Sequence, residues 1–199
     1  MCVFWTANKP STGYGIVDFF YKLCEKIDDT SMLAFMEMYY NMTSVVRNRG
    51  HTTTPIPIQQ ATRQGGRTSA QCYLAYINGL INIISGSGLG ICLYKCNTSC
   101  PTVADDMILM VYSSCALQRM IDICYQYSCK WRFEYNASKC AVIVFTKQRS
   151  NQPKQSWSLG SAVITETSTY THLGLLCDEY MSSSILVDEA IKKLRGTLF

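Results

Sequence analysis

Two adjacent carboxylates carry the clearest chemical potential in this sequence. Asp105 and Asp106 follow residues 101–103 and precede the apolar run 107–111, so the pair is predicted to lie at the tip between two β-strands. Neighbouring carboxylates repel one another unless a cation offsets their charge, and their hard oxygen atoms suit Mg²⁺ or Mn²⁺. By itself the dipeptide also fits a solvated turn, because Asp favours turns. Both interpretations stay open on these two residues alone.

Three further segments accompany the acidic pair in a defined order. Arg63-Gln64-Gly65 precedes a predicted helix, Lys139 lies in the segment 131–145 after the pair, and Tyr170-Thr171-His172-Leu173-Gly174 follows. In this order the segments resemble motifs B, C, D and E of the reverse transcriptase domain of non-LTR (LINE-type) retrotransposons, with the acidic pair as motif C. The resemblance runs from about residue 3 to the last predicted helix.

The resemblance implies RNA-templated DNA synthesis, in which a primer 3′-hydroxyl attacks the α-phosphate of a dNTP with the help of two Mg²⁺ ions. The partners it implies are an RNA template, a DNA primer and dNTPs. It assigns catalysis and metal binding to Asp105 and Asp106, and the primer grip to Leu173 and Gly174. Residues expected to contact nucleotide or template are Arg63, Gln64, Gly65, Ser69 and Lys139.

One motif of the family is altered in this chain. The family's motif A, Asp-x-x-Lys-Ala-Phe-Asp, falls on residues 6–12, where only Lys9 matches. Thr6 stands where the family has the carboxylate that bridges both metals, and Ser11 where it has an aromatic residue. A neutral hydroxyl replaces a bridging anion poorly, so weak Mg²⁺ or Mn²⁺ binding is expected. The alternative function is a non-catalytic remnant that at most binds nucleic acid weakly.

The fold implied is α+β: a polymerase palm, with a small antiparallel sheet and helices packed on one face, partial fingers and the start of a thumb. Residues 1–199 are expected to form a single, truncated reverse transcriptase domain. Within it, 1–181 would be the palm with part of the fingers, and 182–199 the first thumb helix. A third possibility, an unrelated metal-dependent phosphotransferase, would need more acids near the pair. Asp18, Asp122 and Asp178 lie in no motif that supplies them.

Composition excludes several classes of protein. The 199 residues are 48% hydrophobic, yet no apolar run reaches the roughly 18 residues that span a bilayer, so no membrane association is expected and the predicted location is cytoplasmic or nuclear. A net charge of +4 permits contact with phosphates without requiring it. The 11 cysteines are odd in number and contain no Cys-x-x-Cys, which disfavours a disulfide framework or a zinc site. Cys72, Cys124 and Cys140 are expected to be reduced core residues. Oligomeric state stays open.

Local patterns predict the elements that must position these residues. Helices are expected in two stretches within 16–42, with an N-cap at 28–31, and then over 68–84, 114–130 and 182–199. Strands are expected over 43–49, 55–62, 91–94 and 141–145, with turns near Arg49-Gly50 and Leu159-Gly160. The Met and aromatic residues of the second helical stretch are predicted to be core. The glycines of 86–90 are predicted to form a turn, because a strand pattern follows them where a phosphate loop needs a helix.

Overall fold

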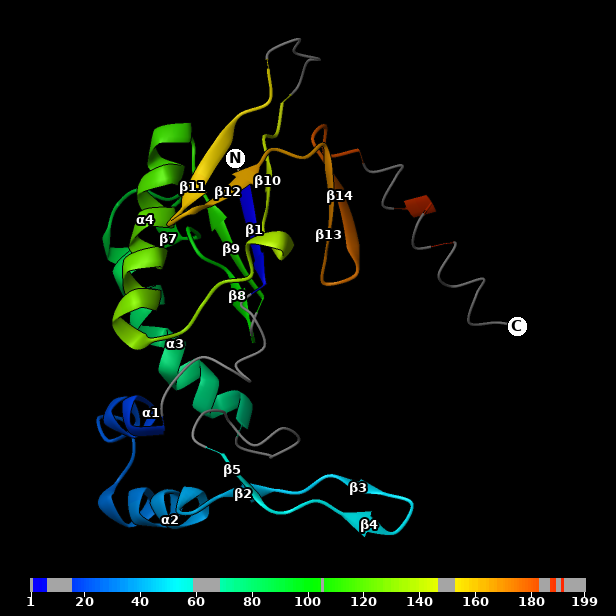
Figure 1. The fold of residues 1–199 in the computed structure, drawn as a ribbon. Coiled ribbons are helices and arrows are strands. Elements are labelled where there is room, and N and C mark those ends of the chain that lie inside the picture. The colour runs from blue at the N-terminus through cyan, green and yellow to red at the C-terminus, as the bar shows by residue number, and fades with distance from the viewer. Residues whose placement is uncertain are drawn as a thin grey trace.

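The computed structural model describes residues 2–6, 16–58, 69–104, 106–146 and 153–182, together with Val187, Asp188 and Ile191. Within these ranges the chain forms four α-helices and several small antiparallel sheets, a mixed α+β architecture (Figure 1). The α+β class predicted from the sequence is therefore confirmed. Among the described residues, no helix is both long and apolar enough to cross a membrane.

The largest sheet has four antiparallel strands in the order β10-β1-β9-β8. β1 (Cys2–Thr6) lies between β10 (Ala141–Ile143) and β9 (Asp106–Met110), and β8 (Thr102–Val103) forms a hairpin with β9. Strands from the beginning, middle and later part of the chain thus meet in one sheet. Because β1 pairs on both sides, its register fixes which residues of β9 and β10 face one another.

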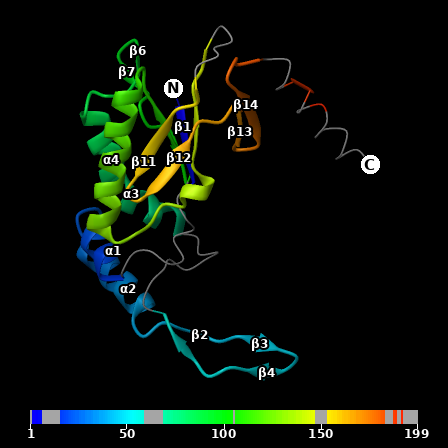
Figure 2. The ribbon, with the colours of Figure 1, turned by 45° about the horizontal axis from the view of Figure 1, so that its top comes forward.

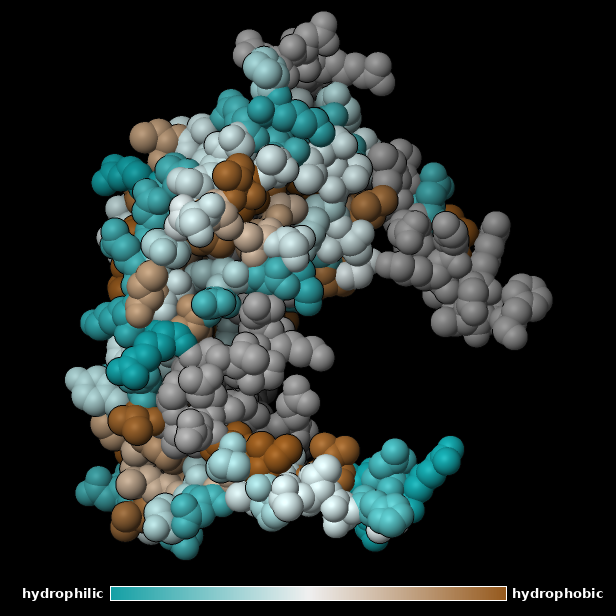
Figure 3. Space-filling view, viewed as in Figure 1, coloured by the Kyte–Doolittle hydropathy of each residue, from teal (hydrophilic) through white to brown (hydrophobic). Residues whose placement is uncertain are grey.

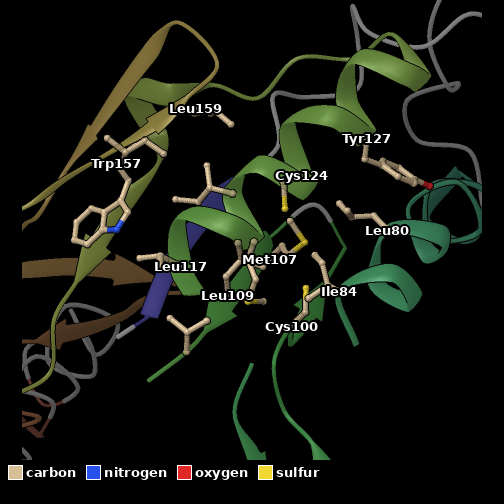
Figure 4. Packing of buried hydrophobic residues seen from close by; sticks show 14 of the residues in the cluster. Leu80, Ile84, Cys100, Met107, Leu109, Leu117, Cys124, Tyr127, Trp157 and Leu159 are labelled. Atoms are coloured by element: carbon tan, nitrogen blue, oxygen red, sulfur yellow. The ribbon is translucent and has the colours of Figure 1, made fainter. Parts of the chain in front are cut away.

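Two long helices cover one face of this sheet. α3 (Ser69–Gly86) and α4 (Ser114–Trp131) lie side by side against it (Figures 1 and 2). The side chain of Ser113 caps α4 by accepting from the Ala116 N–H at 3.2 Å, as predicted. The core between the helices and the sheet includes Leu80, Ile84, Leu109, Leu117, Met120 and Ile121, all fully buried, and Figure 4 shows part of this packing.

Burial along β9 alternates with the period of a strand. Met107 and Leu109 are buried under the helices, as is Val111 just beyond the strand, whereas Asp106 and Ile108 are only partly buried. Since successive side chains of a strand point to opposite faces, Asp106 lies on the face turned away from α3 and α4. The helices thus anchor β9 from one side and leave its acidic residue on the other.

A second hydrophobic cluster joins the N-terminal helices to α3. It consists of Phe19 and Leu23 from α1 (Ile16–Leu23), Tyr39 from α2 (Asp29–Tyr39) and Tyr76 from α3. The two helices and the break between them were predicted. So was the N-cap of α2, where Asp28 accepts from the Ser31 N–H at 2.9 Å.

Short strands after α2 form an arm that extends away from the rest of the molecule (Figures 1 and 2). β2 (Thr43–Ser44) pairs with β5 (Ile56–Pro57), and β3 (Arg47–Asn48) pairs with β4 (His51–Thr52) around a turn at Arg49 and Gly50. The turn is where the sequence predicts it. The strands are shorter than the predicted 43–49 and 55–62, of which 59–62 lie outside the described residues.

One sequence prediction about α2 is confirmed only in part, since Met32 and Phe35 pack against the second hydrophobic cluster but other side chains do not. Its Met and aromatic side chains were expected in the core, yet Leu33, Met36 and Met38 are exposed, and so is Tyr40 at its C-cap. Only Tyr39 of this helix is buried. Hydrophobic residues are correspondingly visible at the surface in this part of the molecule (Figure 3). The described part of α2 buries one narrow stripe against α1 and Tyr76, so composition alone overstated the burial of this helix.

Three hairpins and a short helix complete the described fold. β6 (Cys92–Leu93) pairs with β7 (Cys96–Asn97) after the predicted turn, and β11 (Ser156–Leu159) pairs with β12 (Ala162–Thr165) across Gly160. A short 3-10 helix, η1 (Ala137–Lys139), leads into β10, and β13 (Thr169–His172) pairs with β14 (Leu175–Asp178). Most of the helix predicted over 182–199 lies outside the described residues. Within that range, the described residues Val187, Asp188 and Ile191 are helical.

Candidate active site

Asp106, the described member of the acidic pair, lies at a β-hairpin, as the sequence predicts. β8 ends at Val103, Ala104 has a φ of +53°, and Asp106 is the first residue of β9, paired with Val103. Asp105 itself lies outside the described residues. Asp106 pairs with Val103 on one side and with Thr6 on the other, so its backbone is held in the sheet and the positions that its carboxylate can take are limited.

The neighbouring strand brings Thr6 to this hairpin. In the β1–β9 pair, Thr6 is the Cα partner of Asp106, and the register continues through Trp5 with Met107 to Cys2 with Met110. Two positions separated by a hundred residues of sequence are therefore directly opposed. This register agrees with the motif A alignment, in which Thr6 stands where the family has the carboxylate that bridges both metals.

His172, the last residue of β13, interacts electrostatically with Asp106. Partial burial lowers the pKa of His172, while the charge of the Asp106 carboxylate acts in the opposite direction. This electrostatic coupling indicates that the two side chains are close in space. The sequence interpretation gave His172 no role of its own. The sequence does place His172 directly before the predicted primer-grip residues Leu173 and Gly174, and this position could have indicated that it lies near the site.

The turn between β13 and β14 presents the two predicted primer-grip residues. Leu173 has a φ of +48° and Gly174 a φ of +79°, and the Leu173 side chain is 53% exposed. A hydrophobic side chain displayed at a tight turn is available for contact with another molecule. Its role in gripping a primer stays a prediction.

Lys139 is connected to the same hairpin through its backbone. The Tyr170 hydroxyl of β13 donates a hydrogen bond to the Lys139 carbonyl at 3.0 Å. The η1 turn itself is capped by Asn136, whose side chain accepts from the Ser138 N–H at 3.1 Å. Lys139 is exposed, so the fold joins the predicted motif D lysine to β13 at the surface of the molecule.

The remaining predicted site residues come from the segment before α3. Arg63, Gln64 and Gly65 lie outside the described residues. Ser69 is the first residue of α3, which confirms that the predicted motif B segment leads into a helix. Whether these residues meet the acidic hairpin stays a prediction.

The candidate metal ligands of this site are carboxylate oxygens. Among the described residues, no group of three or more His, Cys, Asp or Glu side chains gathers as a metal site would require. Asp106 contributes a partly buried carboxylate, and Asp105 adjoins it in sequence. Carboxylate oxygens are the ligands that Mg²⁺ and Mn²⁺ prefer, and Mg²⁺ is often held by one or two of them. The donor type therefore fits these cations.

Comparison with known proteins agrees with this arrangement. Residues 16–176, well over half of the chain, match the family model described as reverse transcriptase (RNA-dependent DNA polymerase). The matched range contains the acidic hairpin, α3, η1 and most of the β13–β14 hairpin. A search of curated proteins found no match.

Proposed function

Because this chain belongs to the reverse transcriptase family, we propose that it is the palm of a retrotransposon reverse transcriptase of the non-LTR (LINE) type, with an acidic hairpin that has lost its partner carboxylate. The observation that supports this most strongly is the pairing of Thr6 with Asp106. Adjacent strands of this kind are where a family enzyme needs acids on both, and here one of the two positions is a threonine.

The sheet and its surroundings correspond to a palm in outline. The four-stranded sheet carries the acidic hairpin, α3 and α4 support its far side, and the β13–β14 hairpin lies toward the acidic face as a primer grip would. The arm of β2 to β5, together with α2, corresponds to part of the fingers. Residues beyond 182 would begin the thumb.

Asp105 and Asp106 are the residues that would hold a divalent cation. When bound, Mg²⁺ or Mn²⁺ would lower the charge repulsion at the reacting phosphate. This chain's own residues would orient the reactants: Leu173 and Gly174 against the primer, and the exposed ammonium of Lys139 toward the triphosphate, where a cation stabilises developing negative charge. Arg63, Gln64, Gly65 and Ser69 would contact the nucleotide and template.

Thr6 makes RNA-directed DNA polymerase activity by the unaltered chain unexpected. A threonine hydroxyl is neutral and binds Mg²⁺ much more weakly than a bridging carboxylate does. Loss of one such ligand removes several kcal/mol of transition-state stabilisation, about a thousandfold or more in rate. The second candidate function, a non-catalytic domain that binds nucleic acid weakly, is favoured by this same substitution.

Primer extension on an RNA template tests the proposal. The purified chain, assayed with Mg²⁺ and with Mn²⁺, is expected to incorporate no dNTP, and Thr6→Asp alone is expected to leave it inactive because Ser11 is also altered. If the unaltered chain incorporates dNTPs in a template-dependent way, and Asp105→Ala abolishes this incorporation, the chain is an active polymerase and the proposed loss of activity is wrong.

A chimera supplies the positive arm of the test. The chain is joined to the fingers and thumb of a related enzyme, and Thr6→Asp is combined with Ser11→Phe. Recovery of template-dependent synthesis is expected in the double variant and in neither single variant. If Thr6→Asn with Ser11→Phe recovers activity equally well, the missing carboxylate is not the cause.

A further inference from the structure

A small basic pocket lies among α1, α3 and α4, on the helical side of the central sheet. It has a volume of about 280 Å³. Asp106 faces away from these helices, so the pocket is separate from the candidate active site. Its most prominent lining residues are Tyr21, Lys22, Lys26, Asn82, Lys130 and Trp131.

Lys22 forms the inner wall of the pocket and is already engaged. Its ammonium group donates to the Tyr76 carbonyl at 2.5 Å and to the Tyr127 hydroxyl. It also lies 4.4, 4.3 and 4.0 Å from the ring centroids of Tyr76, Tyr127 and Trp131. Lys22 thus fastens α1 to α3 and α4, and it brings a fixed positive charge to the floor of the pocket.

The lysines that line the pocket outnumber the acidic residues of its lining. Lys26 and Lys130 line it and are exposed, and the one acidic residue of the lining is Glu25. Burial is the main cause of the lowered pKa of Lys22, and the charge of Lys130 adds to it while Glu25 acts in the opposite direction. The ammonium groups of Lys22 and Lys130 therefore repel one another, and an anion between them would relieve that repulsion.

An exposed aromatic surface adjoins these charges. Tyr21 is 64% exposed, and its ring centroid lies 6.1 Å from that of Trp131 at an interplanar angle of 36°. The Lys130 ammonium lies 5.4 Å from the Trp131 centroid. Asn78 and Asn82 add amide groups to the same lining, which can both donate and accept hydrogen bonds. A flat ring, two exposed lysines and two amides match the parts of a nucleotide.

We propose that this pocket binds one nucleotide of a single-stranded nucleic acid, with the base against Tyr21 beside Trp131 and the backbone phosphates at Lys26 and Lys130. Single-strand binding combines base stacking on aromatic rings with lysines along the backbone. The volume of about 280 Å³ lies just below the usual range of ligand pockets, about 300 to 1,000 Å³, and this suits an unpaired nucleotide better than a duplex. The inference does not depend on polymerase activity.

Salt dependence of binding tests the charged half of the site. Affinity of the full chain for a fluorescein-labelled uridine dodecamer is measured by anisotropy at several salt concentrations. For single strands, each phosphate neutralised contributes about 0.7 to the slope of log K against log salt. Lys26→Gln with Lys130→Gln is therefore expected to reduce the slope by about 1.4. The matched control, Lys95→Gln with Lys154→Gln, removes the same charge from exposed positions outside the pocket and should leave the slope unchanged.

Equal losses of slope in the two double variants would overturn the proposal, since net charge alone would then explain binding. Failure of the unaltered chain to bind the dodecamer at low salt would overturn it as well. Circular dichroism of each variant confirms that the fold is retained.

Photo-crosslinking tests the aromatic half and the location. A dodecamer that carries 5-iodouridine is irradiated with the protein, and the modified residue is identified by mass spectrometry. Attachment to Tyr21 or Trp131 is expected, and Tyr21→Leu should weaken binding about fivefold or more. Crosslinks confined to the β13–β14 hairpin or to residues near Asp106 would place the strand in the candidate active site and refute the second site. Such a result would leave the proposed function intact.

Discussion

Thr6 of β1 lies directly opposite Asp106 of β9 in the central antiparallel sheet. Directly opposed positions of such a pair have Cβ atoms about 4.5–5.5 Å apart, a spacing at which two carboxylates can share a cation. If the proposed function is correct, these two opposed positions are the ones that would carry the acids of a two-strand metal site, and position 6 is a threonine.

Replacing Thr6 by aspartate is expected to strengthen divalent metal binding. Thr6→Asp would add a charged oxygen ligand beside Asp106, and Mn²⁺ affinity measured by calorimetry should rise at least tenfold. Thr6→Asn is the matched control, because asparagine has nearly the shape of aspartate without its charge. The Thr6→Asn variant should bind Mn²⁺ as weakly as the unaltered chain. Equal affinities for all three proteins would show that position 6 does not contribute to the metal site.

The sequence predicts those elements that depend on residues close together in the chain. The cap at Ser113, the helix break at Asp28 and the hairpin around the acidic pair each follow from residues within a few positions of one another. The Thr6 alignment came from the family resemblance and agrees with the register of β1.

Relationships that depend on packing were not available from the sequence. The exposure of Met36 and Met38 depends on what covers α2, and the coupling of His172 to Asp106 depends on where the β13–β14 hairpin lies. The cysteines show the same limit. Cys124 is fully buried, as predicted, whereas Cys140 is only partly buried and the Cys72 side chain lies outside the described part of the structure. Cys92, Cys115 and Cys129 are exposed.

Loss of the Lys22 ammonium is expected to destabilise the fold. Lys22→Met keeps most of the side chain's length but removes the contact with three aromatic rings and the bond to the Tyr76 carbonyl. A partly desolvated cation–π contact contributes about 1–2 kcal/mol, so the free energy of unfolding in urea should fall by about that amount. Lys26→Met, at an exposed neighbouring position, should change it by less than about 0.5 kcal/mol.

The buried thiols are expected to make the protein sensitive to alkali. Burial raises the pKa of Cys100 to about 11 and of Cys140 to about 12, from the ordinary value of 9.0. Between pH 9 and 11 the unfolded chain releases these protons and the folded chain keeps them, so stability falls as pH rises. Urea unfolding at pH 7.5 and pH 10 should show this loss, and Cys100→Ala with Cys140→Ala should reduce it.

Lys22 is expected to oppose that alkaline loss. Burial, with a smaller effect from the charge of Lys130, lowers its pKa from 10.5 to about 8. Between these values the unfolded chain holds a proton that the folded chain has lost, so this group stabilises the fold increasingly as pH rises. The decline between pH 8 and 10 should therefore be steeper in Lys22→Met than in the unaltered protein. An equal or shallower decline would contradict the assignment.

Gly90 is expected to tolerate no side chain, because the backbone of Ser99 lies against it. It forms a β-bridge with Val111, just beyond the end of β9, and an added Cβ would lie 2.8 Å from the Ser99 Cα. A backbone atom cannot move aside as a flexible side chain can, so Gly90→Ala should reduce the free energy of unfolding by about 1–3 kcal/mol. Gly86→Ala is the matched control, since a Cβ at that helical position meets nothing within 4 Å and should be neutral or stabilise by up to about 1 kcal/mol. Thermal unfolding should therefore give a lower midpoint for Gly90→Ala than for the unaltered chain, and an equal or higher midpoint for Gly86→Ala. If Gly90→Ala is as stable as Gly86→Ala, the segment before β6 does not support β9.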